Sequence, residues 1–143
     1  MVIKLRLKGS LALTNHPLGA KEFVKRQIDY IKSQDKYTGP KKVLIIGSSS
    51  GYGLASRVSL AFGAGADTIG VAFEEGVEGK RVGSAGWWNT IAFNESAKEE
   101  GLISKNFMGD AFSDEMKADV IKYIKEEFGG KIDLLIYSLA SAS

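Results

Sequence analysis

The chain has 143 residues, of which 44% are hydrophobic and 25% are charged, and its formal net charge is +2. This composition excludes a disordered or collagen-like chain, and the length suffices for one ordinary domain of roughly 100–150 residues. The absence of cysteine excludes a disulfide framework, a thiol nucleophile and a cysteine metal site, and a single histidine excludes a histidine-rich metal site. No apolar run reaches the roughly 18 residues of a membrane span, and residues 1–10 lack the apolar stretch of a signal peptide. We therefore expect a soluble, cytoplasmic protein without a membrane partner.

Basic side chains gather in the first third of the chain. Residues 1–42 carry ten basic and three acidic side chains, whereas residues 43–143 carry nine and fourteen. Within residues 3–8 basic and apolar side chains alternate, which favours a strand with one solvated face over a nucleic-acid patch. No interleaving of aromatic and basic residues and no zinc-ligand spacing supports nucleic-acid binding, so we expect no nucleic-acid partner.

Hydrophobic periodicity and turn residues predict a regular alternation of strands and helices after this first strand. The expected elements are an amphipathic helix over 19–35, a strand over 43–46, a helix over 53–63, a strand over 68–73, a polar loop over 74–81, a helix over 86–100, a weaker strand over 102–107, a helix over 114–128 capped by Ser113, and a buried strand over 132–137. Short apolar strands without alternation are typical of parallel sheets that are covered on both faces. The fold class is therefore α/β, a Rossmann-like doubly wound parallel sheet over 43–143, preceded by a strand-and-helix extension over 1–42. We expect Phe107, Met108 and Phe112 in its core.

A glycine-rich loop with the spacing G-x-x-x-G-x-G joins the first parallel strand to its helix. Gly47 lets the chain turn off the strand, Gly51 lets the backbone approach a pyrophosphate, and Gly53 lets the helix pack on the strand. The amino end of the helix offers free N–H groups and a partial positive charge to phosphates. Further hydroxyl donors come from Ser48, Ser49 and Ser50. The position between a buried strand and a helix predicts a dinucleotide-binding loop.

Acidic and small residues follow the other strands where they end. Glu74 can accept hydrogen bonds from both adenosine ribose hydroxyls and would repel a 2′-phosphate, which favours NADH over NADPH; the alternative is a solvated loop acid beside Glu75. Asp110 can reach the adenine edge, or it can serve only as a turn residue before Ser113. Residues 138–140 end the fourth strand, where ligands collect in an open α/β sheet.

Several segments together resemble one family, the single-chain trans-2-enoyl-CoA reductases, which include bacterial enoyl-acyl-carrier-protein reductases and are similar to short-chain dehydrogenases/reductases. The segments are KKVLIIGSSSGYGLASR, GADTIGVAFEE, GSAGWWNTIAFNESAKEEGL, NFMGDAFSDE and KIDLLIYSLA, and NHPLG at 15–19 is similar to a family His-Pro segment. The resemblance covers essentially the whole chain.

The resemblance implies NADH-dependent reduction of the C2–C3 double bond of a trans-2-enoyl-CoA or enoyl-acyl-carrier-protein thioester in fatty acid metabolism. Hydride would pass from the nicotinamide to C3, and the enolate would be protonated at C2. Carried over to this sequence, the cofactor contacts are Gly47, Ser48, Ser49, Ser50, Gly51, Tyr52, Phe73, Glu74, Asp110, Ala111, Leu139 and Ala140. The resemblance implies no metal, and a monomer or loose dimer.

The family's proton-donating Tyr and its Lys, separated by eight residues, have no counterpart in this chain. Four of the five tyrosines are not followed by Lys at that spacing, and for Tyr137 the position lies past the end of the sequence. The Tyr37 to Lys41 spacing precedes the glycine loop, so we interpret it as coincidence. We therefore expect the catalytic half to lie beyond Ser143. We also expect an exposed sheet edge near residue 138, weak NADH binding at most and no turnover by these 143 residues alone.

Two other readings remain open from the sequence. The chain could be a stand-alone dinucleotide-binding module without catalysis, or part of another short-chain reductase with a different substrate. For His16, a hydrogen-bonded turn residue is favoured over a proton shuttle. The pair Trp87–Trp88 has no assigned role.

Overall fold

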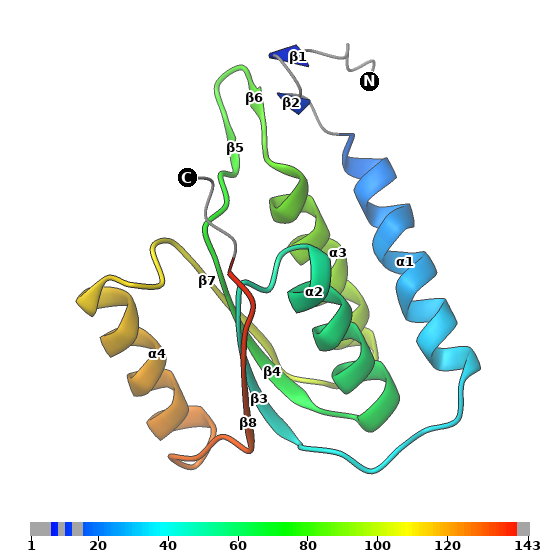
Figure 1. Cartoon of the computed structure of the whole chain (residues 1–143), viewed down its shortest axis with the longest axis vertical. Helices are drawn as coiled ribbons and strands as arrows, with labels where there is room; N and C mark the ends of the chain where they lie inside the picture. The colour runs from blue at the N-terminus through cyan, green and yellow to red at the C-terminus, as the bar shows by residue number, and fades with distance from the viewer. Residues whose placement is uncertain (1–6, 9–10, 13–15, 140–143) are drawn as a thin grey trace.

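The computed structural model describes residues 7–8, 11–12 and 16–139, and its central feature is a four-stranded parallel sheet (Figure 1). The elements in chain order are β1 (Leu7–Lys8), β2 (Leu11–Ala12), α1 (Pro17–Ser33), β3 (Lys42–Ile46), α2 (Gly51–Val58), η1 (Ser59–Gly63), β4 (Asp67–Ala72), β5 (Val77–Glu78), β6 (Arg81–Val82), α3 (Ala85–Glu99), β7 (Ser104–Met108), α4 (Asp114–Glu127) and β8 (Leu134–Tyr137). The single turn η1 is a π-helix that continues α2.

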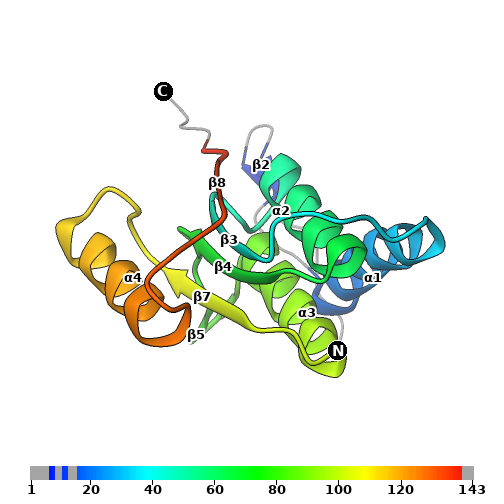
Figure 2. The ribbon, with the colours of Figure 1, turned by 90° about the horizontal axis from the view of Figure 1, so that it is seen from below.

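The strand order is β7-β4-β3-β8, and all three pairings are parallel. The chain runs outward from β3 through β4 to β7, and then returns to the other side of β3 to form β8. Helices α2 and α3 lie on one face of the sheet and α4 lies on the other (Figure 2). The predicted α/β class and the doubly wound parallel sheet are therefore confirmed.

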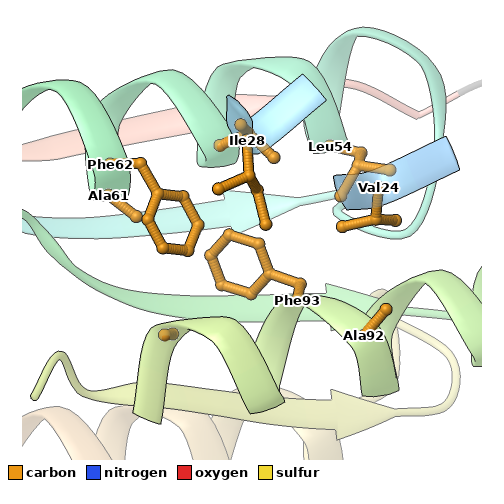
Figure 3. Packing of buried hydrophobic residues seen from close by; sticks show 9 residues of the cluster. Val24, Ile28, Leu54, Ala61, Phe62, Ala92 and Phe93 are labelled. Carbon is orange, nitrogen blue, oxygen red and sulfur yellow. The ribbon is translucent and has the colours of Figure 1, made fainter. Parts of the chain in front are cut away.

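A shared apolar core joins α1, α2, η1 and α3 (Figure 3). Its buried members include Val24 and Ile28 from α1, Leu54 from α2, Phe62 from η1 and Phe93 from α3. The rings of Phe62 and Phe93 meet edge to face, with centroids 5.6 Å apart. Helix α1 thus packs on the outer side of α2 and α3, and it belongs to the same packed body as the sheet.

Among the described residues, α4 is the helix that covers the opposite face of the sheet. Leu44, Ile69 and Val71 of the central strands form a second core with Val120 and Phe128. Ser113 begins α4 as predicted, because its Oγ accepts a hydrogen bond from the N–H of Met116. None of the helices in the described part of the chain has the length and apolar character that crossing a bilayer requires.

The structure corrects three expectations. The polar loop over 74–81 contains the hairpin β5–β6, which the helix behind it supports: Trp88 Nε1 donates a 2.6 Å hydrogen bond to the Val82 carbonyl. The strand expected to be buried over 132–137 is β8, which has Leu135 and Tyr137 53% and 60% exposed and forms the exposed sheet edge expected near residue 138. Phe112, expected in the core, is 62% exposed because it lies in the turn before α4, where no helix of the described structure covers it.

Two predicted elements differ in extent from the observed ones, and the first of them lies partly outside the described residues. Of the strand expected over 3–8, only β1 is described, and it pairs with β2 in an antiparallel hairpin. The helix expected over 53–63 begins two residues earlier, at Gly51.

Candidate functional site

The candidate site lies where β3, β4 and β8 end, at the carboxyl edge of the sheet. The chain leaves β3 toward β4 on one side, whereas β8, on the other side of β3, is reached from β7 through α4, so the ends of β3 and β8 flank a topological switch point. Two adjoining clefts open there. The loop cleft, of about 450 Å³, is lined by residues 47, 49–52, 72–74, 138 and 139. The strand-end cleft, of about 520 Å³, is lined by residues 71–73, 109–112, 137 and 139.

The glycine loop packs closely against the ends of β4 and β8 and the start of α2. The N–H groups of Gly47 and Ser48 both donate to the Val71 carbonyl, at 2.8 and 3.2 Å. Gly47 has a φ of +90°, and a Cβ there would stand 2.0 Å from the Ser138 carbonyl oxygen. A Cβ on Gly53 would stand 1.8 Å from the Gly47 carbonyl oxygen. The first and third glycines therefore allow the loop, β8 and α2 to meet closely.

The outer side of the loop is open. Ser50, the N-cap residue of α2, makes no side-chain capping hydrogen bond among the described residues. Around Gly51 a Cβ would meet no described heavy atom within 4 Å, and Tyr52 is 86% exposed. The amino end of α2 thus presents its first-turn N–H groups, with the positive end of the helix dipole, to the loop cleft.

The three loop serines differ in what they contact. Ser48 is buried and its Oγ lies 3.5 Å from the Val71 carbonyl oxygen, so its hydroxyl faces the protein. Ser49 is also buried, and its Oγ donates a 2.5 Å hydrogen bond to Glu74 Oε1. Only Ser50 is exposed. Of the three predicted hydroxyl donors, Ser50 alone has a side chain free to meet a ligand in the loop cleft.

Glu74 is held by two serines from different elements. Besides Ser49, the Oγ of Ser84, just before α3, donates to Glu74 Oε2. Its neighbour Glu75 is exposed and pairs with Arg81 at 3.2 Å. The solvated acid of this segment is thus Glu75, whereas Glu74 is half-buried on the wall of the loop cleft.

Asp110 lies in the strand-end cleft and also shapes the turn before α4. Its Oδ1 accepts a 2.9 Å hydrogen bond from the N–H of Phe112, and its carbonyl accepts one from Ser113 Oγ. Asp110 therefore has the turn role expected as the alternative to a ligand role. Its exposed carboxylate nevertheless lines the cleft beside Ala111. Phe73 and Leu139 line both clefts and so join them.

The structure brings together most of the residues predicted to contact a cofactor. Those lining one cleft or both are Gly47, Ser49, Ser50, Gly51, Tyr52, Phe73, Glu74, Asp110, Ala111 and Leu139. Ser48 lines neither cleft, and Ala140 lies outside the described residues.

Other candidate catalytic residues lie away from the clefts. His16 is the N-cap of α1, where its Nδ1 accepts a 3.2 Å hydrogen bond from the Leu18 N–H, which confirms the structural role expected for it. Tyr37 Oη lies 2.9 Å from Ser59 Oγ, and Lys41 Nζ donates to the Ala64 carbonyl. Both precede β3, at the opposite end of the sheet from the glycine loop. Within the described residues no group of three or more His, Asp or Glu side chains is placed to hold a metal ion.

Arg57 is a buried residue that supports the site and that no sequence motif singled out. The residue is 1% exposed, and its guanidinium stacks 4.4 Å from the centre of the Phe93 ring. The guanidinium donates to Thr68 Oγ1 at 2.9 Å, to Ser104 Oγ at 3.0 Å and to Asn106 Oδ1 at 2.5 Å. Burial lowers the pKa of Arg57 to about 9, so it is still protonated at neutral pH. It ties α2 to β4, β7 and α3 beneath the loop. The available signal was its spacing three residues after Leu54, on the inward face of α2.

The first turn of α3 also contributes unpredicted residues. Ser84 contacts Glu74, and Asn89 Nδ2 donates a 3.1 Å hydrogen bond to the Ser49 carbonyl. A Cβ on Gly86 would stand 2.1 Å from Glu74 Oε1. No local pattern links residues 84–89 to the glycine loop, because the contact depends on how α3 packs against β7 and α1.

Two family models match the chain in succession. Residues 2–79 match the NAD(P)H binding domain of trans-2-enoyl-CoA reductase, and residues 81–143 match the trans-2-enoyl-CoA reductase catalytic region. The change from one model to the other falls in the turn of the β5–β6 hairpin, although β4 before it and β7 after it pair in one sheet.

Individual proteins match over nearly the whole chain. A trans-2-enoyl-CoA reductase [NADH] of Clostridium beijerinckii is 63% identical over 99% of this chain and 35% of its own length. An enoyl-[acyl-carrier-protein] reductase [NADH] 2 of Photobacterium profundum is 55% identical over 99% of this chain and 36% of its own. The crystal structure of the Clostridium acetobutylicum trans-2-enoyl-CoA reductase in complex with NADH superposes with a TM-score of 0.94 at 54% identity, covering 99% of this chain and 35% of that one. The chain thus spans about a third of the length of these relatives.

Proposed function

Because the chain belongs to the trans-2-enoyl-CoA reductase family, we propose that it is the NADH-binding portion of an enoyl-thioester reductase. One observation carries the proposal: an open helix amino end and an anchored carboxylate, Glu74, line the same cleft at the switch point of the sheet. Relatives that match over almost the whole chain are NADH enzymes by name, and one was solved with NADH.

The residues of the site fit a dinucleotide. The pyrophosphate would lie against the amino end of α2, where Gly51 leaves the space above the backbone open. Glu74 would accept hydrogen bonds from the ribose hydroxyls, and its charge would repel a 2′-phosphate. The adenine would occupy the strand-end cleft near Asp110 and Ala111, with Phe73 and Leu139 on the wall that both clefts share.

When bound, NADH would supply the hydride that reduces the C2–C3 double bond of a trans-2-enoyl-CoA or enoyl-acyl-carrier-protein. The described residues would bind and orient the cofactor. Aromatic side chains are exposed around the clefts at Tyr52, Phe73 and Tyr137. They would exclude water from the clefts once the bound cofactor covers them. We place the complete proton-donating Tyr–Lys pair outside these 143 residues, since Tyr30, Tyr37, Tyr52 and Tyr123 are not followed by Lys at the family spacing and the position for Tyr137 lies past Ser143.

The proposal extends to the protein's setting. We infer that the enzyme works as a monomer or loose dimer in the cytoplasm, where NADH and acyl thioesters are used together. Residues 43–143 would form the NADH-binding half of this enzyme, and residues 1–42 a strand-and-helix extension that braces it through α1.

The test uses the protein expressed from the complete open reading frame, with crotonyl-CoA as substrate and NADH or NADPH as reductant. We expect consumption of NADH, with much slower consumption of NADPH. Binding of NADH to the protein, measured by its fluorescence, reports the cofactor site without requiring turnover. Absence of NADH binding would refute the cofactor site, whereas binding without crotonyl-CoA reduction would refute the enoyl-thioester substrate. Turnover by residues 1–143 alone would show that the acid is misplaced.

A further inference from the structure

We propose that Ser84 is a positioning residue that holds Glu74 in the orientation that selects NADH over NADPH. The inference rests on the proposed function and assigns a role to a residue at the amino end of α3.

Ser84 occupies the N-cap position of α3 but does not cap the helix. Within the described residues its hydroxyl makes no hydrogen bond to the first-turn amides of α3. The hydroxyl proton instead has Glu74 Oε2 as its nearer acceptor, with the Glu75 carbonyl oxygen farther away at 3.2 Å, and the hydroxyl oxygen accepts from the Glu75 N–H at 3.3 Å. The Ser84 N–H donates in turn to the Glu75 carbonyl at 2.9 Å. A serine at an N-cap ordinarily satisfies its own helix, so its use on Glu74 implies a role directed at that carboxylate.

The rest of the first turn of α3 closes around the same carboxylate. The space that a Cβ on Gly86 would fill is occupied by Glu74, whose Oε1 and Cδ would stand 2.1 and 2.4 Å from that Cβ. The carboxylate therefore lies against the amino end of a 15-residue helix, where the helix dipole favours negative charge. Ser49 holds the other oxygen at 2.5 Å, and Asn89 of α3 fixes the Ser49 backbone.

Two anchors on two oxygens restrict rotation of the Glu74 side chain. Each carboxylate oxygen has two lone pairs, so each can still accept one ribose hydroxyl after accepting a serine hydroxyl. A 2′-phosphate placed there would meet a fixed negative charge. Without Ser84, Glu74 would keep only the Ser49 anchor and could rotate away from a 2′-phosphate, so NADH would lose a well-placed acceptor while NADPH would lose a repulsive charge.

The test compares Ser84→Ala, Ser84→Thr and a matched control, Ser33→Ala, in the protein expressed from the complete open reading frame. Ser33 is an exposed serine at the end of α1, away from both clefts, whose hydroxyl donates to the Tyr30 carbonyl and accepts from Gln34 Nε2. Dissociation constants for NADH and for NADPH are measured by fluorescence titration. A hydrogen bond to a charged group contributes about 1.5–3 kcal/mol, so the NADH-over-NADPH affinity ratio is expected to fall about tenfold or more in Ser84→Ala. Ser84→Thr, which keeps the hydroxyl, and Ser33→Ala should keep the wild-type ratio.

The affinity ratio separates positioning from a general structural role. A merely structural loss would weaken both nucleotides equally and leave the ratio unchanged, and that result, or an unchanged ratio with unchanged affinities, would overturn the inference. If Ser84→Ala does not fold, Ser84→Gly provides the same test, because glycine is well tolerated at an N-cap and lacks the hydroxyl. A wild-type protein that binds neither nucleotide would overturn the proposed function together with this inference. If the wild type binds NADH more tightly than NADPH and Ser84→Ala keeps the same affinity ratio, the inference alone is overturned.

Discussion

Replacement of Gly53 by alanine should separate the loop from the helix that follows it. The added Cβ would stand 1.8 Å from the Gly47 carbonyl oxygen, whereas ordinary contact begins at 3.4 Å, so the gap must open by about 1.6 Å, the difference between the two. The backbone at Gly47 cannot move easily to make room, because its N–H donates to the Val71 carbonyl and the Ser138 carbonyl lies close beside it. The expected response is a shift of α2 away from the glycine loop.

That shift would move the first-turn N–H groups of α2 out of reach of the pyrophosphate. Loss of two hydrogen bonds to a charged group, at about 1.5–3 kcal/mol each, predicts NADH binding weaker by roughly 100-fold or more. Overpacking adds a loss of stability of about 1–3 kcal/mol. Titration of NADH fluorescence measures the first effect, and urea denaturation monitored by circular dichroism measures the second.

The matched control is Gly101→Ala, at the end of α3. Gly101 has a φ of +71° with no described heavy atom within 4 Å of its would-be Cβ, so alanine costs about 1–2 kcal/mol of backbone strain without a clash. Both variants should lose similar stability, but only Gly53→Ala should lose NADH affinity. The reasoning about the glycine loop fails if Gly53→Ala binds NADH within a few-fold of Gly101→Ala.

Three further substitutions test the packing that supports the site. Phe93→Ala should lower the free energy of unfolding by about 3–5 kcal/mol, because Phe93 is fully buried between Phe62 and Arg57, and Phe93→Leu should lose clearly less in the same urea titration. Glu100 pairs with Lys32 of α1, and its hydrogen bond to Lys32 holds the pKa of Glu100 below its usual value. Glu100→Gln should therefore lower the free energy of unfolding by less than about 1 kcal/mol at neutral pH, because both side chains of the pair are exposed. The difference in stability between wild type and Glu100→Gln should vanish as the pH falls through the pKa of Glu100 in the folded protein. A difference that persists in acid would contradict the ion-pair explanation. Trp88→Phe removes the hydrogen bond to the Val82 carbonyl, so amide exchange in the β5–β6 hairpin should quicken by an amount equivalent to about 1 kcal/mol while exchange in β3 and β4 stays unchanged.

Local sequence patterns were sufficient for the sheet and for the loop that follows its first strand. Apolar runs such as Val43–Ile46 predict covered parallel strands, and β3 occupies the centre of the sheet as those runs require. The spacing from Gly47 to Gly53 predicts close approaches, which the structure explains in detail through the contacts of both glycines with backbone carbonyls. These features depend on residues close in sequence, or on a rhythm repeated along the chain.

Features made by distant residues were not accessible in the same way. The residue types of 74–81 indicate a polar loop, and only the packing of Trp87 and Trp88 behind that segment makes it a hairpin. The apolar run over 132–137 by itself indicates a buried strand, whereas Tyr137 is 60% exposed because β8 forms the edge of the described sheet, the edge expected near residue 138. Burial depends on the neighbour in space, which periodicity does not identify.

By itself, the sequence determined the α/β class, the parallel sheet, the dinucleotide-type loop and the position of an acid at the end of β4, because each follows from local spacing and periodicity. Only the tertiary structure decided what surrounds that acid. The packing of α3 against β7 and α1 brings Ser84 and Gly86 to Glu74, and the buried guanidinium of Arg57 joins α2 to β7 beneath the loop. Such contacts join residues 10 to 49 positions apart. They form only when the strands have been ordered and the helices packed on them, since the free energy that holds them comes from burial in the assembled core.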